Sequence, residues 1–252
     1  MLFNFRLTPI EEITPWGEPQ SPNLHWFGLT LGEYWINVGS DLLYESSDEF
    51  ISEHGGTRFV DYQVAILHEY LLYLLPHALD PVPTHLENYT CRAGLDRWTE
   101  CWNGWNPQDA DLSEQDADEI IDRLRWIHDL DGGHLSAPPT IRFWTTSDGL
   151  VHIGWKAGHC EIDGVRVWFS DSGSISMPQA EFVAEVRAFH DCLFGAMAER
   201  IKAIEAGGLP ARISISPEEL NRTQSRLIRF EALHYLQLCL RIGKRSRRPC
   251  ST

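Results

Sequence analysis

Residues 141–178 read IRFWTTSDGLVHIGWKAGHCEIDGVRVWFSDSGSISMP, and this stretch decides the predicted fold. Short β-branched and aromatic segments alternate with turn-forming residues at 147–149, 156–158, 163–164 and 171–173. Apolar alternation bounded by glycine and aspartate is typical of short paired strands. Strands are therefore expected at 142–146, 150–155 and 165–169, in an antiparallel meander.

A long amphipathic helix follows Pro178, a residue that suits the first turn of a helix. It is expected to run for about 28 residues, or about 42 Å, and to end at Gly207-Gly208. Arg200 falls at the centre of its apolar stripe. That arginine either buries its stem and forms an ion pair at the rim, or binds an anion in a cleft. The stripe is formed by Phe182, Val186, Phe189, Leu193, Met197 and Ile204.

Weaker signals outside this stretch predict further strands, helices and a loop. Residues 2–7 alternate like a strand, and 24–30 with 33–38 read as a hairpin across Leu31-Gly32. A helix capped by Asp61 should stop at Pro76, after a polar loop over 46–56. Ser113 should cap a helix to about residue 130, and Ser216 another that follows a short strand at 213–215.

These elements together predict an α+β protein. Antiparallel meander sheets would pack against one long and several shorter amphipathic helices. We expect one domain over 1–243, with a possible sub-division near 136–140, and a disordered basic tail over 244–252.

Charge and cysteine content limit the classes of partner and the compartment. The 252 residues carry a net charge of −15, and because five of the 21 basic residues follow Leu240, residues 1–240 carry 16 basic against 36 acidic residues, a net −20. Such a surface repels nucleic acid and attracts a basic protein. The sequence shows no secretory signal and no membrane-length apolar run, and its six cysteines form no C-x-x-C pair. We therefore expect a cytoplasmic protein with no membrane or nucleic-acid partner.

A tryptophan-rich segment is the strongest candidate for a binding site. Trp98, Trp102 and Trp105 lie within eight residues of one another. They could be buried beneath loops as a satellite core, or form a recognition patch in which tryptophan anchors bind and carboxylates steer a basic partner. The second interpretation is favoured. The predicted carboxylates are Asp109, Asp111, Glu114, Asp118 and Asp122.

Catalytic motifs are weaker than this binding signal, and no cofactor is predicted. His128, Asp129, Asp131 and His134 gather around a Gly-Gly pair and could hold a divalent metal. Cys160 could be a nucleophile, but a strand would direct adjacent His159 to the opposite face, which leaves His152 or His190 as its base. His68-Glu69 lacks the second histidine of a zinc-protease motif. A metal- or cysteine-dependent hydrolase is therefore kept as an alternative to a non-catalytic function.

Five segments in order resemble an uncharacterised bacterial family known only as a domain of unknown function. They are FNFRLTPI at 3–10, PWG at 15–17, LHWFGLT at 24–30, FVAEVRAF at 182–189 and MAER at 197–200. By analogy with small acidic bacterial proteins, the resemblance implies an immunity or antitoxin protein that neutralises a basic toxin, and it carries over no functional residues. A scaffold or regulatory protein is the remaining alternative.

Overall fold

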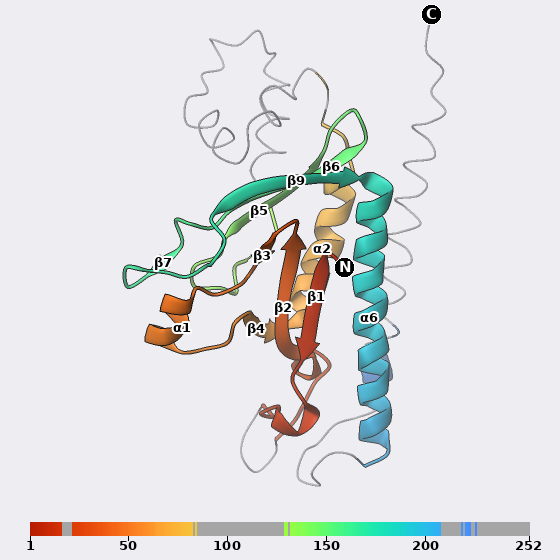
Figure 1. Ribbon diagram of the computed structural model, residues 1–252. Helices are drawn as coiled ribbons and strands as arrows, with labels where there is room; N and C mark the ends of the chain where they lie inside the picture. Colours follow the sequence, from red (N-terminus) through yellow and green to blue (C-terminus); the bar gives the residue numbers. More distant parts are fainter. Residues whose placement is uncertain are drawn as a thin grey trace, which may run out of the picture. The chain divides into compact units, whose positions relative to one another are not determined.

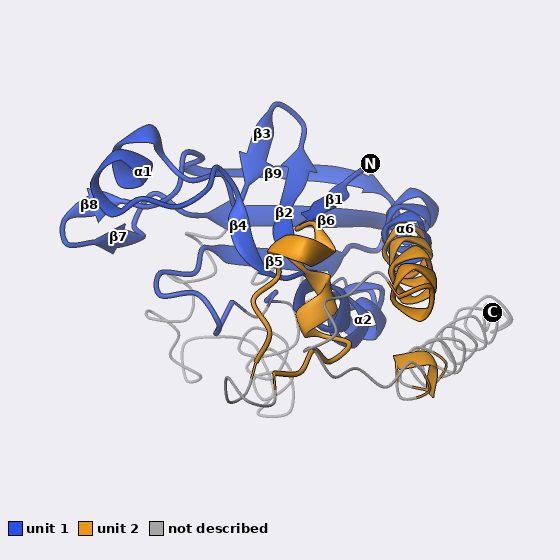
Figure 2. Cartoon of the chain, turned by 90° about the horizontal axis from the view of Figure 1, so that it is seen from below, with its two compact units in different colours: residues 1–7, 32–191 blue, residues 8–31, 192–252 orange. Residues whose placement is uncertain are grey.

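The structure is a computed structural model that describes residues 1–16, 22–82, 84, 129–130, 132–207, 218, 220–222 and 225. The chain divides into two compact units, coloured separately in Figure 2. The first contains residues 1–7 and 32–191, and the second contains 8–31 and 192–252. Residues 136–140, where a sub-division was considered, lie within the first unit. Antiparallel sheets and several helices confirm the α+β class.

The first sheet begins at the N-terminus, as predicted for residues 2–7. Its strands are β1 (Phe3–Leu7), β2 (Leu31–Val38), β3 (Asp41–Leu43) and β4 (Val60–Gln63), in the order β1-β2-β3 with β4 also on β2. The predicted hairpin of 24–30 with 33–38 is wrong. Residues 28–30 form the 3-10 helix η2 (Gly28–Thr30), and β2 pairs with β1 instead.

The second sheet is the meander expected from residues 141–178, with one strand different. Strands β5 (Thr140–Thr145) and β6 (Leu150–Lys156) confirm the first two predictions. The third strand is β9 (Ser172–Pro178) rather than 165–169, and the order is β5-β6-β9 (Figure 1). Residues 161–166 form a separate hairpin of β7 (Glu161–Ile162) and β8 (Val165–Arg166). In the serine- and glycine-rich β9 the apolar alternation is limited to Ile175 and Met177, which is a weak signal for a strand.

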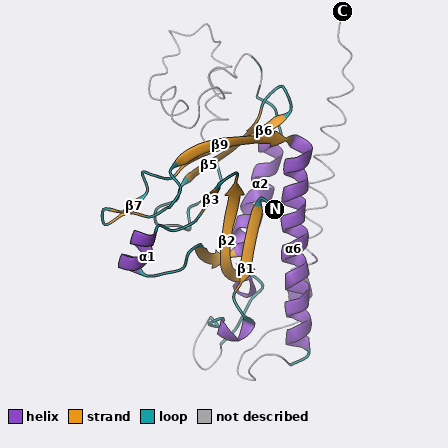
Figure 3. Cartoon of the chain, in the orientation of Figure 1, coloured by secondary structure: helices purple, strands orange, loops and turns teal. Residues whose placement is uncertain are grey.

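Three α-helices lie among the described residues, drawn in purple in Figure 3: α1 (Asp48–His54), α2 (Val64–Ala78) and α6 (Gln179–Glu205). The last confirms the long helix, and all six predicted stripe residues are buried. Helix α2 starts after β4 rather than at Asp61, and Pro76 lies inside its last turn instead of stopping it. Helix α1 replaces the predicted loop, because Ser47 accepts a hydrogen bond from the amide of Phe50 and caps it.

Aromatic rings form the centre of the first unit. Phe3 of β1 lies 6.4 Å from Phe143 of β5, 6.2 Å from Phe182 of α6 and 5.9 Å from Phe189 of α6, measured between ring centroids. All four rings are buried. Each such pair contributes about 0.5–1.5 kcal/mol beyond the burial of its area. This cluster joins β1, β5 and the first half of α6.

Several predictions lie outside the described residues. These are the helix at 113–130 up to residue 128, the strand at 213–215, most of the helix after Ser216 and the tail at 244–252. The predicted end of the first helix at about residue 130 is wrong, because Asp129 forms a β-bridge with Arg142 and the Leu130 amide donates to the carbonyl oxygen of Ile141. In the portion that the structure describes, no helix has the length and apolar character needed to cross a membrane.

Candidate protein-binding surface

Phe169 is the most exposed feature of an otherwise buried stretch. Its side chain is 64% exposed, while Val167 and Trp168 before it are each 4% exposed. The indole Nε1 of Trp168 donates to the carbonyl oxygen of Ala137 at 2.8 Å, which anchors the stretch to the first unit. Single exposed apolar side chains are common on protein surfaces, so the ring is a candidate contact only together with the groups that hold its backbone and the charges near it.

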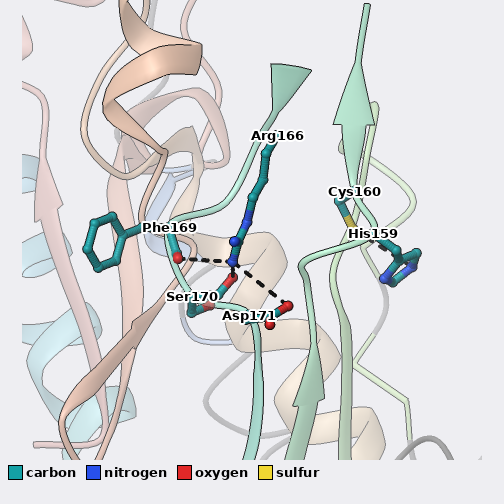
Figure 4. A network of polar contacts seen from close by, with 6 residues as sticks. All are labelled: His159, Cys160, Arg166, Phe169, Ser170 and Asp171. Carbon is teal, nitrogen blue, oxygen red and sulfur yellow. Dashed lines mark hydrogen bonds and ion pairs between the residues drawn. The ribbon is translucent and has the colours of Figure 1, made fainter. Parts of the chain in front are cut away.

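Hydrogen bonds on both sides hold the backbone of Phe169 in place. Its amide donates to the carbonyl oxygen of Glu45 at 2.8 Å. The Arg166 guanidinium donates from Nη2 to the carbonyl oxygens of Phe169, at 3.1 Å, and Ser170, at 2.8 Å. Figure 4 shows the ring directed away from this guanidinium. Because the backbone around Phe169 is already ordered, binding of a partner to the ring costs little conformational entropy in this segment.

Exposed carboxylates lie on the segments next to Phe169. Asp171, whose side chain is 74% exposed, lies 3.9 Å from the Arg166 guanidinium. Glu161 is exposed and is paired with Arg166 across the β7–β8 hairpin. Arg166 is the one basic residue between positions 159 and 186, and it is turned toward main-chain carbonyls. Arg58 is an exposed cation near the same stretch, and it forms an ion pair with Glu45. Asp171 and Glu161 are therefore balanced in part by two arginines that are each paired with protein groups.

Helix α1 adds two more carboxylates to the same surface. The Ser47 hydroxyl donates to the carbonyl oxygen of Arg166 at 2.6 Å, so the start of α1 lies beside β8. Asp48 and Glu49 occupy the first turn of α1 and are exposed. The Phe169 surface is defined here as Phe169 with Asp48, Glu49, Glu161 and Asp171.

Cys160 and His159 are closer than the sequence indicated. The prediction that they point to opposite faces is wrong, because residues 158–159 form a turn, and Cys160 Sγ lies 3.9 Å from His159 Nε2 (Figure 4). Cys160 is buried and its Sγ donates to the carbonyl oxygen of Pro138 at 3.3 Å. Burial raises the pKa of the Cys160 thiol, so the neutral thiol prevails at pH 7. That does not favour a nucleophilic cysteine.

The other two histidines considered as bases contact other groups. His152 Nε2 lies 2.9 Å from the Thr146 hydroxyl, and the His152 ring stacks on Trp144. His190 Nδ1 lies 3.1 Å from Nε2 of buried His68.

Two members of the candidate metal cluster are described, and each contacts protein. Asp129 accepts two hydrogen bonds from the Arg142 guanidinium. His134 Nε2 lies 2.5 Å from the hydroxyl of buried Tyr34. Burial above all raises the pKa of Tyr34, which keeps that phenol neutral. His128 and Asp131 lie outside the described residues, and within those residues no three His, Cys, Asp or Glu side chains form a group that could hold a metal ion.

Arg200 binds main-chain oxygens in the second unit. Its guanidinium donates to the carbonyl oxygens of Thr8 and Leu29. Burial lowers the pKa of Arg200, and the nearby Glu11 carboxylate acts in the opposite direction. Arg200 therefore joins α6 to the segment that contains η1 (Ile10–Glu12) and η2. These contacts were not foreseen, because backbone carbonyls leave no signature in a sequence.

Replacement of Arg200 by methionine is expected to lower the free energy of unfolding by about 1–3 kcal/mol, because two carbonyl oxygens lose their donor. Thermal or urea denaturation measures the change. Lys202→Met is the matched control, since Lys202 is exposed on the same turn and pairs with exposed Glu199. Equal stability of the two variants would show that the Arg200 contacts contribute nothing.

The predicted recognition patch cannot be placed. Trp98, Trp102 and Trp105 lie outside the described residues, as do the five carboxylates predicted to accompany them. Phe169 was assigned to a strand instead. The signal that could have singled it out is the pair Trp168-Phe169, where two large aromatics immediately precede a polar turn and strand alternation directs one of them outward.

The model of a family described as "Family of unknown function (DUF5984)" matches residues 2–233. Searches of the curated proteins and of the solved structures found no match.

Proposed function

Because the chain belongs to this family of unknown function, whose description carries no activity, we propose a function from the chain's own surface. The protein is a non-catalytic binding module of the immunity or antitoxin type, and its partner is a basic protein such as a bacterial toxin. The cytoplasmic location expected from the sequence is part of this proposal.

The observation that carries the proposal is the exposed ring of Phe169 on a hydrogen-bonded backbone. Aromatic side chains that fit into a pocket of the partner supply most of the free energy at many protein interfaces. Phe169 meets the requirements for such an anchor, because its ring is 64% exposed while its amide and carbonyl groups are both hydrogen-bonded.

The charge of the surface supports a basic partner. Asp48, Glu49, Glu161 and Asp171 are exposed on segments that adjoin the Phe169 stretch, and the whole chain carries −15. Carboxylates at the rim of an interface accelerate the encounter with a cationic protein and make the association rate depend on salt. The tryptophan-rich segment at 98–105 and the carboxylates after it remain part of the proposed binding site as a prediction.

Phe169→Ala is expected to weaken capture of the partner at least about tenfold, because the anchor is lost while the hydrogen-bonded backbone stays. The immobilised protein is exposed to native lysate, captured proteins are identified by mass spectrometry, and the strongest candidate is purified for titration. Tyr73→Ala is the matched control. Tyr73 is 71% exposed and belongs to α2, which contributes no residue to the Phe169 surface.

The proposal also requires that the purified partner be basic and that its toxicity on expression be relieved by the wild-type chain. An acidic partner, or one that binds Phe169→Ala and wild type equally, would contradict it. The variants Trp102→Ala and Asp118→Ala test the tryptophan-rich segment separately. Each is expected to bind the partner more weakly than wild type while the protein stays folded.

A further inference from the structure

Strand β9 forms one edge of the second sheet, and no other strand of the described residues pairs with its outer side. In the order β5-β6-β9, β9 has β6 on one side only. The amide of Ala157 donates to the carbonyl of Asp171, and the amide of Gln179 donates to the carbonyl of Gly149. In an antiparallel pair every second residue exchanges hydrogen bonds with its partner, so Gly173, Ile175 and Met177 bond inward to β6. The residues between them, Ser172, Ser174 and Ser176, direct their amides and carbonyls outward.

Pro178, the next residue in the outward series after Ser176, agrees with this assignment. Pro178 is opposite Leu150 and has no amide hydrogen, as expected at an outward position. Of the backbone hydrogen bonds between described segments, none involves residue 172, 174 or 176.

The usual protections of a sheet edge are missing from β9. Natural edge strands carry charged side chains, bulges or a proline in mid-strand, or are very short. The seven residues of β9 contain no charge, and the proline is the last of them. At about 3.3 Å per residue, the edge is about 23 Å long, enough to accept a strand from another molecule.

We propose that a strand of the basic partner adds to the outer edge of β9. This inference rests on the proposed function and names the mode of binding. Exposed Asp171 precedes the strand and exposed Glu181 follows it, so the edge is neutral at its centre and negative at both ends. Its complement is a strand with an uncharged centre and lysine or arginine at its ends. Asp171 belongs to the Phe169 surface, so strand and anchor form one continuous site.

A fluorescein-labelled peptide, Lys-Lys-Thr-Val-Thr-Val-Thr-Lys-Lys, tests the edge without knowledge of the natural partner. We expect it to bind the full chain with a Kd below about 1 mM. Hydrogen exchange of the amides at Ser172, Ser174 and Ser176 should slow, while other amides keep their rates. A peptide with glutamate in place of each lysine should not bind, and neither should the cationic peptide with alternate amides N-methylated.

Ser174→Pro separates backbone pairing from other contacts. The outward amide of residue 174 makes no hydrogen bond to β6, so the sheet tolerates proline there. A partner strand would lose the hydrogen bond from this amide and would clash with the proline ring. The peptide should bind this variant at least about tenfold more weakly. Ser174→Ala keeps the amide and should bind like wild type. Circular dichroism and thermal denaturation establish that both variants are folded.

Strand addition is overturned if no peptide binds, if both peptides bind equally, or if Ser174→Pro binds like Ser174→Ala. A dimer of the chain, detected by sedimentation and abolished by Ser174→Pro, would assign the edge to a second copy and also overturn it. With the purified partner, loss of binding in Phe169→Ala but not in Ser174→Pro overturns strand addition alone. Unchanged binding in both variants overturns the proposed function as well.

Discussion

Replacement of Gly32 by alanine is expected to destabilise the protein by about 3 kcal/mol, the upper end of the usual cost of overpacking. A Cβ atom at position 32 would lie 2.3 Å from the carbonyl oxygen of Arg6 and 2.7 Å from Cα of Leu7. Both contacts are backbone atoms of β1, which pairs with β2 through Leu7 and Gly32. No side-chain rotation relieves such a clash, so the end of β1 must separate from β2.

Urea denaturation of Gly32→Ala and Gly195→Ala measures this effect against a matched control. Gly195 lies in α6 and nothing is within 4 Å of a Cβ built there. Alanine in a helix is more stable than glycine by about 0.5–1 kcal/mol, so Gly195→Ala should raise the free energy of unfolding. Two variants with the same chemical change should therefore shift stability in opposite directions. A neutral Gly32→Ala would show that β1 and β2 are not packed as described.

The second large effect is a loss of stability in mild acid that depends on His68. This side chain of α2 is buried beside the ring of Phe189 and faces His190 of α6. Burial, and secondarily the neighbouring His190, lowers the pKa of His68 to about 3. In the unfolded chain a histidine has a pKa near 6.5. The native state therefore disfavours the proton that the unfolded state binds.

The difference in pKa between the two states determines how the free energy of unfolding changes with pH. Above about pH 6.5 both states are neutral at His68, and the full stability is present. As the pH falls toward 3, the unfolded state is protonated and the native state is not, so stability is lost at about 1.4 kcal/mol per pH unit. Between pH 6.5 and 5 the free energy of unfolding should fall by about 1.6 kcal/mol from this residue.

Urea denaturation at pH 6.5 and pH 5 measures the slope in wild type and in His68→Leu. The leucine variant should lose most of the pH dependence between these values. His159→Gln is the control and should keep the wild-type slope, because His159 is exposed. A His68→Leu slope equal to that of wild type would mean that His68 takes up its proton as easily in the native state as in the unfolded state.

Elements with a strong local pattern could be predicted from the sequence. The apolar stripe of α6 repeats at helical spacing over the whole helix, and the turn at 147–149 separates two alternating strands. Helix α2 was found for the same reason, with Val64, Leu67, Leu71 and Leu74 all buried. Its continuation through Pro76 was not found, since a proline in a last turn removes one hydrogen bond and does not always end a helix.

The candidate site was not predicted, because the Trp168-Phe169 pair by itself does not show which of the two aromatic side chains is exposed. Phe169 and Trp168 are adjacent aromatics of similar hydrophobicity, yet one is 64% exposed and the other 4%. The difference comes from Glu45 and Ala137, which are distant in the sequence and hold this stretch in one orientation. The openness of β9 likewise depends on which strands lie beside it.

The sequence alone determined the α+β class, the long helix, the first two strands of the meander and the negative charge, because composition and periodicity are properties of neighbouring residues. Tertiary structure decided the pairing of β2 with β1, the strand at 172–178, the exposure of Phe169 and the burial of His68. Each of these depends on contacts between segments far apart in the chain. Such contacts are selected by the packing of the whole unit rather than by the local pattern.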